Sequence, residues 1–110
     1  MPKIAAATFN GKTGSYKFKV YLIDTTFNAI GAVYIFTKRT EDASGAGTHK
    51  LIYIGQTDSL ADRIPNHAKW PCFRRKGANC ICVHADDSEE SRLGKEADLL
   101  AAHSTPCNEQ

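Results

Sequence analysis

The chain has 110 residues and a formal net charge of +2, with 42% hydrophobic and 24% charged residues. This size allows one compact domain with a single modest core, and the composition is ordinary for a soluble globular protein. The longest apolar runs have the length of a strand and are too short to span a bilayer. The first residues lack the apolar stretch of a secretory signal. We therefore expect a cytoplasmic protein without a membrane segment.

Positive charge is unevenly distributed along the chain. Residues 1–39 carry six Lys or Arg against one acid, residues 60–83 carry five against one, and acids are concentrated in residues 86–98. Two basic blocks can form a face that attracts phosphate. They can equally be solvated strand edges and loops, where lysine prevents edge pairing. Charge alone therefore leaves nucleic-acid binding and an ordinary soluble surface both open.

The first elements in chain order are predicted to form a β-hairpin. A strand at residues 7–9 leads into a turn over residues 10–14, and apolar residues then alternate with polar ones over residues 16–22. Asn10-Gly11 favours such a turn because both residues tolerate positive φ. We expect this hairpin to extend the sheet of the domain or to pack at its edge.

The remaining elements are predicted to follow the order β-β-α-β-α. The first helix is predicted to begin near Asp58 or Ser59, because Ser59 forms an acidic variant of the capping box with Asp62. Pro65 predicts a break or kink in this helix. Ser88 or Asp87 caps the closing helix, which has acids in its first turn. The expected strands are residues 31–36, 50–55 and 79–84, and the closing helix is residues 88–103.

This order of elements predicts an α/β (α+β) fold, a small domain with a central antiparallel or mixed sheet flanked by helices. We expect residues 1–30 to form the N-terminal hairpin extension and residues 31–110 to form the main domain. Together they should make one compact unit. The small, polar, glycine-rich residues 41–48 predict a loop between two of the strands.

The four cysteines, Cys72, Cys80, Cys82 and Cys107, leave several arrangements open. Two disulfides are possible in number, but nothing in the sequence indicates an oxidising compartment. Cys80 and Cys82 alternate in an apolar run, which is typical of buried free thiols on one face of a strand. A zinc site that uses these cysteines or His67 is the other alternative, although the paired C-x2-4-C ligands of most structural zinc sites are missing.

Residue types that act on phosphodiester bonds recur at fixed spacings from residue 31 onward. Arg63 follows Tyr53 by ten residues, His67 follows Arg63 by four, and Asn108 follows Glu96 by twelve. Together with Tyr34 and the run Tyr53-Ile54-Gly55, this order and spacing resembles the GIY-YIG nuclease family, which cuts phosphodiester bonds with one divalent metal. The resemblance covers roughly residues 31–108.

The first motif departs from the pattern of that family. Where the family shows Gly-Ile-Tyr, this chain has Ala32-Val33-Tyr34, with the glycine displaced to Gly31. Alanine adds one methyl group, which a strand tolerates unless backbone or ligand must approach closely. The second motif is intact, and its Gly55 would permit a tight exit from the strand into the helix.

The resemblance implies a catalytic role for four of the matched residues. Tyr34 would act as general base or position the attacking water, with nearby cations or metal lowering its pKa from about 10. Arg63 would bind the scissile phosphate through its planar fork, and Tyr53 would lie beside that phosphate. His67 would carry a proton or bind phosphate, because its ordinary pKa allows either charge state.

The resemblance also implies that Glu96 binds the metal, Mg²⁺ or Mn²⁺, and that Asn108 buttresses the site from the carboxyl end. A carboxylate beside the buried stripe of the closing helix can reach one hard cation that keeps its water. We expect Asp98, further from this stripe, to be a solvated charge, and we expect a neighbour to pack closely over Gly94. The stripe is expected to consist of apolar residues at helical spacing, Leu93, Ala97, Leu100 and Ala101.

Two functions follow from the resemblance. The first is a metal-dependent endonuclease acting on nucleic acid, expected to be DNA, and the complete set of chemical residues favours it. The second is a catalytically inactive relative that binds nucleic acid or a protein, which the altered first motif favours. A homodimer or a protein partner could supply target recognition. The residues expected to bind the nucleic acid are Lys69, Arg74, Arg75 and Lys76.

Overall fold

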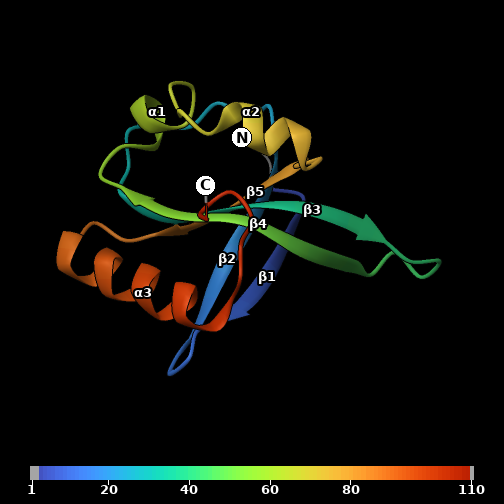
Figure 1. Ribbon diagram of the computed structural model, residues 1–110, viewed down its shortest axis with the longest axis horizontal. Coiled ribbons are helices and arrows are strands. Elements are labelled where there is room, and N and C mark those ends of the chain that lie inside the picture. The colour runs from blue at the N-terminus through green and yellow to red at the C-terminus, as the bar shows by residue number, and fades with distance from the viewer. Residues whose placement is uncertain (1–2, 110) are drawn as a thin grey trace.

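The computed structural model describes residues 3–109 and contains a five-stranded antiparallel sheet (Figure 1). The strands are β1 (Ala5–Asn10), β2 (Ser15–Leu22), β3 (Ala32–Glu41), β4 (Gly47–Thr57) and β5 (Cys80–Ala85). The helices are α1 (Leu60–Arg63), α2 (Trp70–Arg75) and α3 (Glu89–Ala102). The order of strands across the sheet is β1-β2-β5-β3-β4. The expected α/β (α+β) fold with an antiparallel sheet flanked by helices is confirmed.

The N-terminal hairpin extends the sheet, as the sequence predicted. β1 pairs with β2 from Ala5↔Val20 to Asn10↔Ser15, and β2 continues the sheet by pairing with β5. Asp98 of α3 holds the hairpin turn, because its carboxylate accepts hydrogen bonds from the Gly14 amide at 3.0 Å and the Tyr16 hydroxyl at 2.7 Å. The expectation that Asp98 is a solvated charge was therefore wrong.

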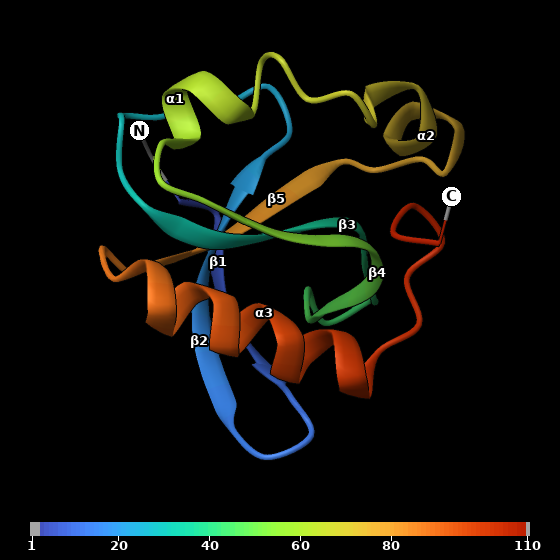
Figure 2. The ribbon, with the colours of Figure 1, turned by 60° about the vertical axis from the view of Figure 1, so that its left-hand side comes forward.

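The sheet buries a hydrophobic core on each of its two faces. Helices α1 and α2 cover one face, and α3 covers the other (Figure 2). The first core contains Tyr34, Phe36, Ile81 and the α2 residue Phe73. The second core contains Val33, Ile35, Ile54, Cys82 and Leu99 of α3. Alternate residues of β3 thus serve opposite cores, as expected for a strand covered on both faces.

A β-bulge interrupts the pairing of β3 with β4. Phe36 pairs with Tyr53 and Thr37 pairs with Leu51, so Ile52 is an extra residue in β4. The bulge lets Ile52 and Tyr53 both pack toward the first core. It also leaves the Ile52 carbonyl to accept a hydrogen bond from the Cys107 amide at 3.0 Å. The C-terminal segment is thereby attached to the outer edge of β4.

Helices α1 and α2 confirm two predictions. Ser59 is the N-cap of α1, and its hydroxyl accepts a hydrogen bond from the Asp62 amide. The helical segment breaks at Pro65, so that α1 ends at Arg63 and α2 starts only at Trp70. The interruption leaves His67 in a non-helical stretch between the two helices. Packing, and not helix geometry, therefore sets the direction of the His67 side chain.

The buried face of α3 differs from the predicted apolar stripe. Leu93 is 46% exposed and Leu100 is 37% exposed, whereas Arg92 and Leu99 are buried. Ala97 and Ala101 are exposed as well. Nothing lies within 4 Å of a Cβ placed on Gly94, so the expected close neighbour is also absent among the described residues. The prediction was wrong because a mixed face, with Arg92 and Glu96 beside Leu99, turns inward.

The cysteines divide into one disulfide and two free thiols. Cys72 of α2 is joined to Cys107 of the C-terminal segment, and Cys80 and Cys82 are free and buried, as predicted. Residues 3–109 contain no group of three or more His, Cys, Asp or Glu that could hold a metal ion. No helix in the same range is long and apolar enough to cross a membrane.

Breaking the disulfide with Cys107→Ser should lower the free energy of unfolding by about 3–4 kcal/mol, because a cross-link over a sequence separation of 35 residues restricts the unfolded chain. Urea denaturation measures this loss. Reductant should shift the midpoint of the wild type to that of the variant and leave the variant unchanged. Equal midpoints for oxidised and fully reduced wild type would contradict the prediction.

Candidate active site

Tyr34 lies at the centre of the site, where β3 runs beside the edge strand β4. Tyr34 pairs with Gly55, and its side chain is fully buried. A Cβ on Gly55 would lie 2.6 Å from the Tyr34 hydroxyl oxygen and 2.8 Å from the Tyr53 ring. Gly55 is therefore required because the Tyr34 ring crosses over it. The predicted role of Gly55 in a tight strand exit was wrong, since β4 continues to Thr57.

Two side chains donate hydrogen bonds to the phenol oxygen of Tyr34. His67 Nε2 lies 2.9 Å from this oxygen, and Arg63 Nε donates to it at 3.4 Å. The Lys69 amide donates to His67 Nδ1 at 3.1 Å, so the proton of a neutral His67 resides on Nε2. His67 Nε2–H is then a donor to Tyr34. The Tyr34 oxygen accepts from both neighbours, and its own proton is not used in either contact.

The protein environment keeps both Tyr34 and His67 neutral at pH 7. Burial raises the pKa of the Tyr34 phenol above its ordinary value, and the hydrogen bond from Arg63 opposes this effect only in part. Burial, followed by the charges of Arg63 and Lys69, lowers the pKa of His67 to about 4. Arg63 therefore lowers the pKa of Tyr34 as expected, but burial raises it by more, so the net effect of the protein groups is opposite to the expected one.

The lowered pKa of His67 predicts a loss of stability in mild acid. An unfolded histidine binds a proton near pH 6.5 and the folded one only near pH 4, so stability should be complete above pH 6.5 and fall as the pH drops toward 4. The loss from this residue is at most about 3 kcal/mol. Urea denaturation across this window measures it.

His67→Gln is the matched variant, because its amide can still donate to Tyr34 while it carries no titratable group. Its stability should depend less on pH between 6.5 and 4 than that of the wild type. Hydrogen bonds lower the pKa values of Asp86 and Asp98, so these two residues make stability depend on pH mainly below pH 4. Identical pH dependence for the two proteins would contradict the assignment of a neutral, buried His67.

Tyr53 and Arg63 form the accessible mouth of the site. Tyr53 is half-buried, its ring is stacked on Tyr34 with the centroids 6.1 Å apart, and it meets the His67 ring edge-on at 4.9 Å. Arg63 is exposed at the end of α1 while its Nε reaches Tyr34. Arg63 also interacts with the Tyr53 side chain, and its exposed guanidinium can bind an anion from solvent beside the Tyr34 oxygen.

Glu96 approaches the same part of the molecule from α3. Its carboxylate is close enough to contribute to the raised pKa of Tyr34. Glu96 is half-buried, and burial raises its own pKa. Among residues 3–109 we find no hydrogen bond or ion pair to this carboxylate. A half-buried carboxylate without a protein partner is suited to a hard cation, and one such ligand suffices for Mg²⁺, which keeps several waters.

Asn108 is firmly attached although it lies near the end of the chain. Its Oδ1 accepts from the Ile54 amide at 2.8 Å, and its Nδ2 donates to the Ile54 carbonyl at 2.9 Å. The Asn108 side chain thus pairs with the outer edge of β4 as a strand would. It fixes the segment between Tyr53 and Gly55 and makes no direct contact with the phenol of Tyr34.

The basic residues predicted to bind nucleic acid lie on α2 and directly before it. Lys69 is half-buried and near enough to His67 to influence its pKa. Arg74 is exposed and its guanidinium lies 5.5 Å from the centre of the Trp70 ring. Arg75 and Lys76 are exposed at the C-terminal end of α2. Lys69 is therefore next to the site, and the other three continue along the helix.

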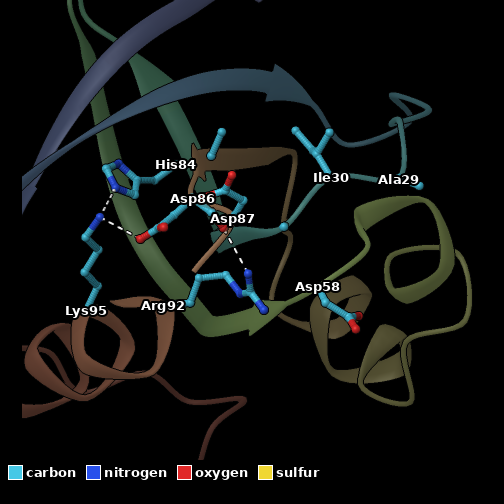
Figure 3. A pocket seen from close by; sticks show the side chains of 10 residues that line it. Ala29, Ile30, Asp58, His84, Asp86, Asp87, Arg92 and Lys95 are labelled. Carbon is cyan, nitrogen blue, oxygen red and sulfur yellow. Dashed lines mark hydrogen bonds and ion pairs between the residues drawn. The ribbon is translucent and has the colours of Figure 1, made fainter. Parts of the chain in front are cut away.

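A cavity of about 880 Å³ lies between the end of β5, the segment before β3 and the first half of α3 (Figure 3), and none of its lining residues belongs to the site around Tyr34. Arg92 is buried in its wall and donates to Gln56 Oε1 and to the Asp86 carbonyl, both at 3.0 Å. Lys95 forms an ion pair with Asp86 at 2.8 Å. The Arg92–Gln56 bond ties α3 to β4 one turn before Glu96, and the contacts of Arg92 and Lys95 with Asp86 tie α3 to the end of β5. Sequence reasoning missed Arg92, although its spacing of four residues from Glu96 places both on one face of the helix.

No family model, curated protein or solved structure matches this chain. The resemblance to the GIY-YIG nucleases therefore depends on the spacing of the matched residues and stays a prediction.

Proposed function

We propose that the chain is a metal-dependent endonuclease of the GIY-YIG type that hydrolyses phosphodiester bonds in DNA. The observation that carries the proposal is the unpartnered carboxylate of Glu96 near the phenol of Tyr34, which itself accepts hydrogen bonds from Arg63 and His67. A half-buried carboxylate without a partner lowers stability. A fold that only binds nucleic acid gains nothing from it, whereas a site for a divalent cation requires it.

Arg63 is proposed to bind the scissile phosphate. Its guanidinium is exposed, and its Nε is already oriented by the Tyr34 oxygen. The other guanidinium nitrogens can donate two parallel hydrogen bonds to phosphate oxygens, and these bonds strengthen as negative charge develops in the transition state. Tyr53, stacked on Tyr34, lines the side of the same opening.

Glu96 is proposed to hold one Mg²⁺ or Mn²⁺ ion as its only ligand from the protein. When bound, the ion would stabilise the negative charge that develops on the phosphate. The donor chemistry fits, because a carboxylate oxygen is the ligand that these hard cations prefer and water can fill the remaining positions. The raised pKa of Glu96 is consistent with a position from which water is partly excluded.

Tyr34 is proposed to orient the attacking water or to accept its proton. The hydrogen bonds donated by His67 and Arg63 stabilise negative charge on the phenol oxygen, because hydrogen bonds to an ionised form favour that form. They also hold this oxygen beneath Arg63, where a phosphate would bind. His67 acts through Tyr34 as a positioning residue in this arrangement.

The basic residues of α2 are proposed to contact the DNA backbone outside the cleaved bond. Arg74 and Lys76 are exposed, and Lys69 lies next to His67. Such contacts raise affinity in a salt-dependent way and add no chemistry. We also propose the cytoplasm as the compartment. In that compartment the Cys72–Cys107 disulfide would be reduced, because reducing compartments rarely retain structural disulfides.

The proposal is tested by incubating the wild type with supercoiled, linear and branched DNA and with RNA, in Mg²⁺ or Mn²⁺. We expect DNA cleavage that requires the metal and stops in EDTA, and the preferred member of the panel identifies the substrate. Cleavage that persists in EDTA would reject the metal-dependent mechanism.

An inactive binding relative is the second candidate. The complete burial of Tyr34 favours it, since an attacking water must reach the phenol oxygen, and so does Ala32 in place of the usual glycine. DNA binding without cleavage in either metal would support this candidate and reject the nuclease.

A further inference from the structure

A second cavity, of about 490 Å³, lies between the two outer strands of the sheet, β1 and β4. On one side it is lined by five consecutive residues of β1, and on the other by three consecutive residues of β4. Consecutive residues of a strand point to opposite faces, so a cavity that touches all of them follows the edges of the strands. The lining residues are Ala5, Ala6, Ala7, Thr8, Phe9, Arg39, Gly47, Thr48, His49 and Leu51.

Both strand edges along this cavity are without strand partners in the described part of the chain. β1 pairs only with β2. β4 pairs with β3, and the C-terminal segment occupies its outer edge only at Ile52 and Ile54, beyond the cavity. Natural edge strands usually carry lysine, proline or a bulge that prevents further pairing. Residues 5–9 carry no charge and no proline, so the β1 edge is open to another strand, whereas β4 carries Lys50 and the bulge at Ile52.

Arg39 gives the cavity its only formal charge. Its Nη1 pairs with Glu41 at 2.7 Å, and the Glu41 side chain is 56% exposed. Arg39 Nε is buried and has no hydrogen-bond partner, and among the described residues it is the only buried side-chain nitrogen or oxygen in that state. A Cβ at Gly47 would come within 2.5 Å of this Nε, so the glycine provides the space that the guanidinium occupies.

The rest of the cavity wall adds no negative charge. His49 is neutral at pH 7, because burial and the charge of Arg39 lower its pKa, and its Nδ1 lies 2.9 Å from the Thr37 hydroxyl. The other lining residues are apolar, small or hydroxylated. The guanidinium already carries the exposed Glu41 carboxylate on Nη1, so a carboxylate of a ligand would share or replace this partner, and its two oxygens match the planar fork.

We propose that this cavity binds an extended peptide segment of a protein partner, which adds as a strand between β1 and β4 and presents an acidic side chain to Arg39. Main-chain hydrogen bonds to the open edges would provide affinity, and the acidic side chain would provide specificity. A nucleic-acid backbone fits less well, because the slot offers one cation to a ligand with many phosphates. The slot lies beside the first half of β4, whereas Tyr53 and Gly55 lie in the second half.

Three synthetic peptides of about eight residues, the length of an ordinary strand, test the proposal. The first alternates valine and threonine around one central glutamate. The second has glutamine at the centre, and the third repeats the first with a methyl group on every second main-chain nitrogen. By fluorescence anisotropy the glutamate peptide should bind saturably, the glutamine peptide about tenfold more weakly, and the methylated peptide not at all.

Arg39→Gln should abolish the difference between the glutamate and glutamine peptides. Lys12→Gln, in the exposed hairpin turn outside the cavity lining, should preserve it. Amide chemical-shift changes on binding should be concentrated in residues 5–9 and 47–51. If Arg39→Gln does not fold, the affinities of the three peptides for the wild type test the proposal by themselves. Equal affinity for all three peptides, no binding up to about 1 mM, or displacement of the peptide by DNA would overturn the proposal. All of these experiments measure peptide binding, so their outcome does not depend on whether the protein cleaves DNA.

Discussion

Glu96→Gln should abolish divalent-metal binding and slow DNA cleavage by about a thousandfold or more, because the ion supplies several kcal/mol of charge stabilisation in the transition state. Glutamine has nearly the same shape but no charge, so the change removes the ligand and preserves the packing of α3. Mn²⁺ binding by electron paramagnetic resonance and single-turnover cleavage rates measure the two effects.

The substitution should leave stability unchanged or raise it. The wild-type carboxylate is half-buried without a partner, and burial raises its pKa, so replacing it with a neutral amide removes an unfavourable burial of charge. Glu90→Gln is the matched control, because Glu90 lies in the exposed first turn of the same helix. Loss of Mn²⁺ binding in the Glu90 variant, or its retention in the Glu96 variant, would contradict the assignment of the metal ligand.

Tyr34→Phe should slow cleavage by about a hundredfold to a thousandfold under single-turnover conditions with saturating DNA. The ring and its packing remain, but the oxygen that would orient or deprotonate the attacking water is lost. The change also leaves His67 Nε2–H and Arg63 Nε without their shared acceptor, which should cost about 1–3 kcal/mol of stability.

The pH dependence of the rate separates the chemical role of Tyr34 from a structural one. Burial raises the pKa of Tyr34, so the ionised fraction increases about tenfold per pH unit over the range below that pKa. The wild-type rate should rise with pH, and Tyr34→Phe should lose this rise. Tyr21→Phe is the control, since Tyr21 packs against Phe27 on the periphery of the same core. A Tyr34 variant that cleaves within about threefold of the wild type would exclude the proposed role.

Local sequence signals predicted most of the fold. Ser59 marked the start of α1 and Pro65 marked the break before α2, because each of these residues acts on the backbone within a few positions. The same holds for Ser88, whose hydroxyl caps α3 by accepting from the Ser91 amide. Asn10-Gly11 marked the hairpin turn correctly, but the reason given for it was wrong, since neither residue has a positive φ. The alternation of apolar residues in β2 located a strand with one buried face.

The features that sequence reasoning missed depend on contacts between distant segments. The inward face of α3 carries Arg92, which is stabilised by Gln56 of β4 and by the Asp86 carbonyl, and helical periodicity of apolar residues cannot reveal such partners. The bulge at Ile52 arises from the pairing of β3 with β4. Glu96 was selected for its spacing to Asn108 and for its position beside the predicted apolar stripe, and only the second of these reasons was wrong.

The site geometry was likewise only partly predictable. Arg63 and His67 contact one oxygen from the two sides of the break at Pro65, and packing against Phe36 and Phe73 sets the direction of the His67 ring. The tautomer of His67 follows from the Lys69 amide, which no side-chain pattern indicates. Gly55 was identified in the sequence. The reason why this position requires glycine is that the Tyr34 ring crosses over it, and this is visible only when the two strands are paired.

Nicking of supercoiled DNA by the wild type and by Glu96→Gln, in parallel titrations of Mg²⁺ and Mn²⁺, tests the proposed nuclease most directly. The wild type should nick the DNA with a saturable dependence on either metal, and the variant should remain at the rate seen in EDTA throughout both titrations. The same residual nicking by both proteins at every metal concentration would contradict the nuclease proposal and favour the inactive binding relative.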